Sequence, residues 1–144
     1  MGAVTVGDII VTPLKNISVV GGNVMHAMKC TDTGYTGFGE AYFSIVEKAA
    51  VKAWKRHIRM TLNLIVPFGF VRFVFVDQYG DKRIEKIGKN RFSRLTVPPG
   101  IWFGFEGLEN NDSLVLNIAD IIHEPDEVER MEMEAIDFDW KKGR

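Results

Sequence analysis

The sequence predicts an all-β fold, either a barrel or a sandwich. Short runs rich in β-branched and aromatic residues recur along the chain, turn residues separate them, and helical periodicity is scarce. The runs are ISVV (17–20), FGEAYFSIV (38–46), VKAWKRHIRM (51–60), TLNLIV (61–66), FVRFVFVD (70–77), RFSRLTV (91–97), IWFGFEGL (101–108) and SLVLNIADII (113–122). The turn signals are GGN (21–23), PFG (67–69), YGD (79–81), PPG (98–100) and ENND (109–112).

The 144 residues are enough for one hydrophobic core and too few for two, so we expect a single domain over residues 1–144. The formal net charge of -1 favours neither nucleic acid nor membrane as a partner. Cys30 is the single cysteine and cannot form an internal disulfide, and the N-terminus lacks the pattern of a signal peptide. We therefore expect a cytoplasmic protein.

Residues 51–60 stand out because basic residues and one histidine are interleaved with apolar residues. Side chains alternate between the two faces of a strand, so Lys55, His57 and Arg59 are expected to share one face. The simpler interpretation is a solvated basic face, and the alternative is the wall of a cationic pocket.

The run at 70–77 is apolar on both faces except at Arg72. A strand buried on both sides belongs in the middle of a sandwich or in a dimer. A buried arginine is costly unless it is paired, so Arg72 should either point into a polar cavity or meet an acid.

The one credible helix is PDEVERMEME, residues 125–134, because Pro125 suits a first turn and Asp126 and Glu127 favour a helix N-terminus. The surrounding residues 124–139 contain eight acids and only Arg130 as a base. An acidic segment that covers the basic strand is one way to combine these opposite charges.

No phosphate-binding glycine loop, GxSxG elbow or CxxC pair occurs in the chain. Two segments are similar to loose signatures of the cupin fold. Lys55-Arg56-His57 stands where the fold has its HxH pair, and PPG (98–100) stands at its PxG turn, with Phe103 in place of the histidine that follows. Only His57 remains of four metal ligands, so we expect no metal. The resemblance implies a double-stranded β-helix (jelly-roll) barrel, here with a short C-terminal helical segment.

Within cupins the sequence resembles the dTDP-4-dehydrorhamnose 3,5-epimerase family from about Gly39 to Trp140. Five blocks carry the likeness in the same order: GEAYFS (39–44), KAWKRH (52–57), VPPGIWFGFEGL (97–108), NIADIIHEPDE (117–127) and IDFDW (136–140). The resemblance implies a homodimeric β-barrel without metal or cofactor that acts on a nucleotide-linked 4-keto-6-deoxy sugar.

The resemblance fails at the residues that act in the family. The family's base histidine falls on Lys55, its acid tyrosine on Leu116 and the histidine after the PPG turn on Phe103. The carboxylate that orients the base falls near Met133, between Glu132 and Glu134. The chain is therefore expected to be a divergent member rather than an ordinary 3,5-epimerase.

We hypothesise that His57 is the base and Lys55 the electrophile for one proton transfer next to the sugar ketone, because a histidine with a pKa near 6.5 can accept that proton at neutral pH. Loss of the second acid would favour isomerisation or inversion of a single centre. The expected substrate contacts are Lys52, Arg59, Arg72, Asn63, Asn117 and Tyr42. The alternative is a catalytically inactive cupin that binds a sugar or another anion, or an interaction subunit in polysaccharide biosynthesis.

Overall fold

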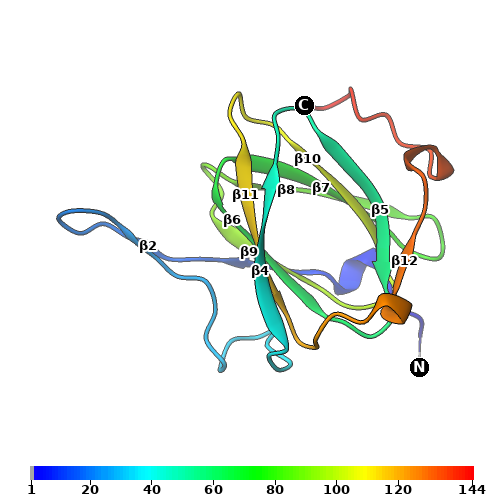
Figure 1. Ribbon diagram of the computed structural model, residues 1–144, viewed down its shortest axis with the longest axis horizontal. Coiled ribbons are helices and arrows are strands. Elements are labelled where there is room, and N and C mark those ends of the chain that lie inside the picture. Colours follow the sequence, from blue (N-terminus) through cyan, green and yellow to red (C-terminus); the bar gives the residue numbers. More distant parts are fainter. Residues whose placement is uncertain (1) are drawn as a thin grey trace.

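The computed structural model describes residues 2–144, and it consists of two five-stranded antiparallel sheets that face each other (Figure 1). The first sheet has the order β1 (Ile10–Pro13), β9 (Ser93–Val97), β6 (Leu62–Phe68), β11 (Ser113–Ala119) and β4 (Glu40–Val46). The second sheet has the order β12 (Val128–Arg130), β5 (Val51–His57), β10 (Trp102–Gly107), β7 (Phe70–Val76) and β8 (Lys82–Gly88). The all-β, cupin-type architecture is confirmed.

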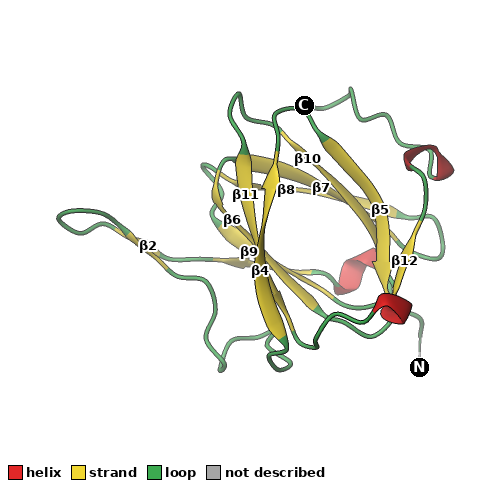
Figure 2. Ribbon diagram, in the orientation of Figure 1, coloured by secondary structure: helices red, strands yellow, loops and turns green. Residues whose placement is uncertain are grey.

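The C-terminal segment differs from the predicted helix over 125–134. Figure 2 shows only short helical turns there, and these are the 3-10 turns Pro125–Glu127 and Met133–Ala135, with strand β12 between them. Strand β12 forms because its backbone pairs with β5, with Val128 opposite His57. Sheet pairing thus overrides the local helical signal. A third 3-10 turn, Val6–Asp8, precedes β1. Among the described residues, no helix has the length and apolar character needed to cross a bilayer.

The main hydrophobic core lies between the two sheets. Phe73 and Phe75 from β7 and Phe103 from β10 pack there against Leu64 of β6 and Leu95 of β9. A second, smaller core lies on the outer face of the second sheet, where C-terminal side chains cover β5 and β7. Its buried members are Trp54, Val74, Val76 and Trp140. The prediction that residues 70–77 are buried on both faces is therefore confirmed.

Arg72 belongs to this outer layer. Its guanidinium donates to the carboxylate of Glu106 and to the carbonyl oxygens of Trp140 and Lys142, and it lies 5.4 Å from the ring centroid of Phe138. Of the two environments expected for Arg72, the structure contains the acid, and Arg72 also borders a hollow of about 380 Å³ on the outer face of the second sheet. The contact fixes the C-terminal segment on the outside of the barrel.

A two-stranded hairpin, β2 (Asn16–Ile17) and β3 (Val24–Met25), projects from the body of the protein and is the blue extension on the left of Figure 1. The predicted run ISVV (17–20) supplies one strand residue and the tip of this hairpin. Gly21 turns the chain there with a φ of +91°, a conformation that favours glycine.

Candidate functional site

The inner face of β5 carries the basic residues predicted from the sequence. Lys55 lies opposite Phe103 and Lys52 opposite Phe105, so three steps along β5 match two steps along β10. This extra residue is a β-bulge, and it places Lys52 on the same face as Lys55. Strict alternation along the strand would have put these two lysines on opposite faces.

His57 is held by a buried carboxylate. The side chains of His57 and Glu127 are 4% and 0% exposed, and His57 Nδ1 hydrogen-bonds to Glu127 Oε1. The second oxygen of Glu127 accepts from the backbone amides of Arg59 and Met60, each at 3.1 Å. The backbone also fixes this segment, because the amide of Ile58 donates to the carbonyl of Glu127 at 2.8 Å.

These hydrogen bonds determine the tautomer of His57. An ionised carboxylate only accepts hydrogen bonds, so we assign the imidazole proton to Nδ1. Nε2 then presents a lone pair, and this atom is buried without a hydrogen-bond partner among the residues that the structure describes. A neutral histidine oriented by a carboxylate is the arrangement that proton abstraction requires.

The pKa values favour the same protonation states. Burial lowers the pKa of His57 below 6.5, although the hydrogen bond and charge of Glu127 oppose this shift. Burial raises the pKa of Glu127, but the hydrogen bonds from His57 and from the amides of Arg59 and Met60 outweigh it and hold the pKa below 4.5. At neutral pH the pair therefore consists of a carboxylate and a neutral imidazole.

We expect Glu127→Gln to slow proton transfer about tenfold or more and to move the acid limb of the pH–rate profile. If His57 is the base, activity requires its neutral form, and the wild-type rate should then fall as the pH drops through a midpoint below 6.5. Glu127 raises the pKa of His57, so its removal should lower this midpoint further. Glu129→Gln, which removes an exposed acid from the same segment, should leave the profile unchanged. An acid limb that stays in place or moves upward in Glu127→Gln would contradict the assignment.

A cationic pocket of about 190 Å³ lies along β5, and neither His57 nor Glu127 lines it. It is lined by Lys52, Ala53, Trp54, Lys55, Phe103, Phe105, Arg130 and Met131. Within residues 2–144, none of the cations Lys52, Lys55 and Arg130 has an ion-pair partner. The pocket thus combines three cations that have no ion-pair partner with the phenyl rings of Phe103 and Phe105. This combination suits a ligand that carries both an anionic group and a ring.

Lys55 lines the pocket and contacts the same phenylalanine as His57 does. Its Nζ is 5.8 Å from the centroid of Phe103, and the ring of His57 stacks on the same phenyl group at 6.3 Å between centroids. Burial lowers the pKa of Lys55 below 10.5, and the charges of Arg130 and Lys52 lower it further, whereas Glu127 raises it. A negative charge that forms next to Lys55 would relieve this unfavourable environment.

Tyr42 and Asn117 lie on the inner face of the first sheet. They share their strands with the core residues Val46 and Val115, two or four positions away, and Asn117 Nδ2 donates to Tyr42 Oη at 2.8 Å. Asn117 Oδ1 is buried and unpaired within the described chain. Leu116, which the resemblance aligns with the acid tyrosine, points to the outer face instead.

Three of the predicted substrate contacts are not brought to this site. Arg59 lies beyond the end of β5, where it is exposed and paired with Glu124. Asn63 lies on the outer face of β6 and bonds to the carbonyl of Gly34 and the hydroxyl of Thr96. Arg72 lies on the outer face of β7, as described above. These positions correct the prediction that all three residues line the cavity.

The orienting acid also differs from the prediction. Glu127 occupies this role, not Glu132 or Glu134, which flank Met133 in the last 3-10 turn. The sequence carries no clear signal for it, because Glu127 is one of eight acids in residues 124–139 and the three strand residues that follow it, VER, do not alternate between apolar and polar.

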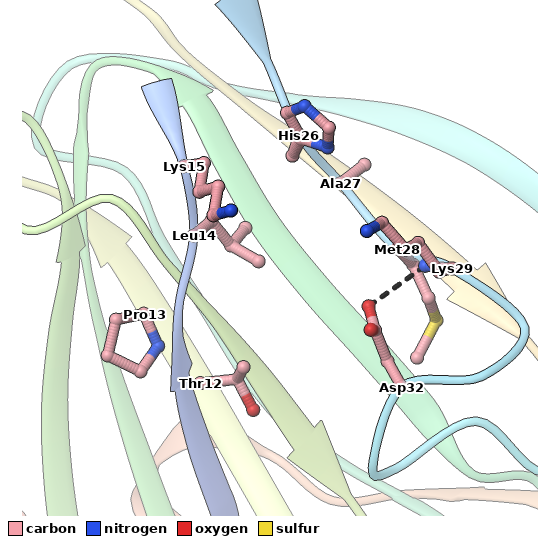
Figure 3. A pocket seen from close by; sticks show the side chains of 9 residues that line it. All are labelled: Thr12, Pro13, Leu14, Lys15, His26, Ala27, Met28, Lys29 and Asp32. Atoms are coloured by element: carbon pink, nitrogen blue, oxygen red, sulfur yellow. Dashed lines mark hydrogen bonds between the residues drawn. The ribbon is translucent and has the colours of Figure 1, made fainter. Parts of the chain in front are cut away.

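Another cavity, of about 150 Å³, lies at the root of the hairpin (Figure 3). Thr12 and Lys15 line it from the segment that leads into the hairpin, and His26 and Lys29 line it from the segment that leaves the hairpin. Its carboxylate, Asp32, accepts from the amide of Lys29 at 2.9 Å and pairs with Arg94. Asp32 therefore serves the fold. Nowhere in residues 2–144 do three or more His, Cys, Asp or Glu side chains converge as metal ligands.

No protein-family model and no curated protein matches the sequence. Among solved structures, the chain is similar to a dTDP sugar isomerase from Desulfovibrio desulfuricans G20, with 33% identity and a TM-score of 0.90 over 95% of this chain and 93% of that one. It is also similar to a dTDP-4-dehydrorhamnose 3,5-epimerase from Sulfolobus tokodaii, with 21% identity and a TM-score of 0.79 over 90% and 80% of the two chains. A sugar 3,4-ketoisomerase from Thermoanaerobacterium thermosaccharolyticum in complex with TDP shares 15% identity, with a TM-score of 0.76 over 91% and 93%.

Proposed function

Because the chain belongs to the family of dTDP-sugar isomerases and dTDP-4-dehydrorhamnose 3,5-epimerases, we propose that it moves a proton next to the ketone of a nucleotide-linked 4-keto-6-deoxy sugar. The observation that carries this proposal is the buried pair of His57 and Glu127, with the free Nε2 of His57. The reaction needs a base that is unprotonated at neutral pH, and burial lowers the pKa of His57 below 6.5 and so keeps it neutral there.

In the proposed reaction His57 Nε2 takes the proton from the carbon beside the ketone. The electron pair of the broken C–H bond moves into the new C=C bond, and the ketone oxygen becomes an enolate. The ammonium of Lys55 stabilises the negative charge on this oxygen, and Glu127 stabilises the imidazolium. Isomerisation returns this proton to the former ketone carbon while the proton of the neighbouring hydroxyl moves to the enolate oxygen, so that the neighbouring carbon becomes the ketone. Inversion of the centre would instead need a proton delivered from the opposite face of the sugar.

We favour proton transfer at one centre over a double inversion. The inner faces of β7 and β10 carry Phe73, Phe75, Phe103 and Phe105, which cannot donate a proton. On the opposite sheet, Tyr42 carries a hydroxyl whose oxygen accepts a hydrogen bond from Asn117. Leu116, at the position that the resemblance aligns with the acid tyrosine, has no proton to give, so a single exchange is favoured.

Deuterium incorporation tests the proposal. Incubation with TDP-4-keto-6-deoxyglucose in heavy water should place deuterium at one carbon beside the ketone, as measured by NMR or mass spectrometry. If TDP binds but no deuterium is incorporated, the result supports the alternative, a catalytically inactive cupin that binds a sugar. If neither occurs, the nucleotide-sugar function is wrong.

We propose that the cationic pocket holds the nucleotide diphosphate. Lys52→Ala and Arg130→Ala should each weaken TDP binding about tenfold or more, because hydrogen bonds to charged groups contribute about 1.5–3 kcal/mol. Lys82→Ala, which removes an exposed cation from the distant strand β8, is the matched control and should bind normally. Titration followed by NMR or calorimetry measures these constants. If both pocket variants bind TDP with unchanged affinity, the diphosphate binds outside this pocket.

We also propose that the active protein is a cytoplasmic homodimer. Exposed Phe43 and Ile45 on strand β4 give the monomer an uncovered apolar surface. The lone Cys30 is a free thiol, which suits a reducing compartment.

A further inference from the structure

A hollow of about 380 Å³ lies on the outer face of the second sheet, and we call it the outer hollow. Arg72 of β7 and Lys86 of β8 lie opposite each other in the sheet, so both side chains belong to this face. The lining includes Arg72, Ile84 and Lys86 of these two strands and Phe138, Asp139 and Lys142 of the C-terminal segment. None of these residues lines the cationic pocket, so the outer hollow is a separate place on the molecule.

Two walls of the outer hollow are apolar. Ile84 is 47% exposed, and Phe138 is a half-buried ring that packs against the smaller core. A cavity of about 150 Å³ is enough to hold benzene. The outer hollow therefore has room for one aromatic ring together with a small group attached to it.

The charge around the outer hollow is positive. Within residues 2–144, neither Lys86 nor Lys142 has an ion-pair partner. Among the described residues, Asp139 is the one acid in the lining, and its Oδ1 accepts from the amide of Lys141 at 3.0 Å. The two ammonium groups therefore favour a ligand that carries negative charge.

Arg72 adds to this positive charge. Its side chain is 1% exposed, and it shares the carboxylate of Glu106 with Arg144, so one acid serves two guanidinium groups. Arg72 Nε is also buried without a hydrogen-bond partner in the part of the chain that the structure describes, which is costly for a charged donor. An anion in the outer hollow would lie beside this incompletely compensated cation.

We propose that the outer hollow binds a small ligand that joins a flat apolar ring to one anionic group, such as an aryl carboxylate or an aryl phosphate. The ring covers Ile84 and Phe138, which removes apolar surface from water. The anionic group pairs with the ammonium groups of Lys86 and Lys142. The proposal does not depend on the reaction that the protein catalyses.

A titration with 4-fluorobenzoate, followed by fluorine NMR, tests the proposal on the full chain. The probe should bind saturably, and the uncharged 4-fluorobenzamide should bind at least about tenfold more weakly, because it cannot pair with the two lysines. The same titration with 4-fluorophenyl phosphate shows which of the two anionic groups the hollow prefers. If 4-fluorobenzoate does not bind at concentrations up to about 10 mM, or the amide binds equally well, the proposal is wrong.

Two double variants test whether the charge that matters is at the hollow. Lys86→Met/Lys142→Met should weaken binding of 4-fluorobenzoate at least about tenfold. Lys82→Met/Lys141→Met is the matched control, since it removes the same charge from the same strand and the same C-terminal segment but from positions that do not line the hollow. The control should bind as the wild type does. Equal losses in both variants would indicate general attraction of an anion and overturn the proposal.

Two single variants locate the ring. Ile84→Asp places a negative charge in the apolar wall and should abolish binding, while its melting temperature stays close to wild type because the position is exposed. Lys52→Ala changes the cationic pocket and should leave the affinity for 4-fluorobenzoate unchanged. A probe that binds normally to Ile84→Asp but weakly to Lys52→Ala occupies the cationic pocket, and this result would contradict a site at the outer hollow.

Discussion

Replacing His57 with asparagine should slow deuterium exchange beside the sugar ketone at least about 100-fold, the contribution typical of a general base. Asparagine can still donate a hydrogen bond to the buried Glu127, so it removes Nε2 while leaving the carboxylate a partner. His57→Ala should be equally slow and less stable, because it leaves Glu127 without its side-chain partner. Exchange rates by NMR and melting temperatures measure both effects.

The affinity for TDP separates loss of the base from loss of the site. Both His57 variants should bind TDP as the wild type does, since the cationic pocket is lined by other residues. Lys55→Met, in contrast, should reduce both binding and exchange. If His57→Asn binds TDP and exchanges deuterium at the wild-type rate, another residue is the base and the proposed mechanism is wrong.

Replacing Arg72 with methionine should lower the free energy of unfolding by about 3–5 kcal/mol, because it leaves the buried Glu106 without its main partner. Arg72 is 1% exposed and also bonds to two carbonyl oxygens of the C-terminal segment, so these contacts are lost with it. For a chain of this length the loss corresponds to a drop in melting temperature of about 10–15 °C. Urea denaturation measures the free energy directly.

Two further variants define the origin of this loss. Arg72→Met/Glu106→Leu should be more stable than Arg72→Met alone, because it also removes the unpaired acid. Arg56→Met breaks the exposed pair with Glu129 and should cost no more than about 1 kcal/mol. Equal losses in Arg56→Met and Arg72→Met would show that burial of the pair is not the cause.

The fold followed closely from the sequence because sheet strands leave a local pattern. Strand β7 was predicted as buried on both faces and is. Strand β8 was not predicted, because KRIEKIG is an edge strand with four charged residues and resembles a loop in composition. The helix expected after Pro125 failed because backbone pairing with β5 outweighed local propensity.

The site could be predicted only in part. The shared face of Lys55 and His57 follows from alternation, and the register in the structure agrees with it. The position of Lys52 could not follow, since a single inserted residue at the bulge reverses the face. Asn63 and Arg72 face outward because segments far away in the sequence cover the outer faces of both sheets. The alternation of residues along a strand does not reveal which distant segments cover its outer face.

The pair of His57 and Glu127 joins positions that are 70 residues apart, and the acid comes after all the strands of both sheets except β12. During synthesis His57 is therefore made before most of the barrel strands, and Glu127 is made after them. A chain released early, before residue 127, could bury much of the same core but would hold its imidazole without an orienting group. Completion of translation is thus a condition for orienting this imidazole as well as for full stability.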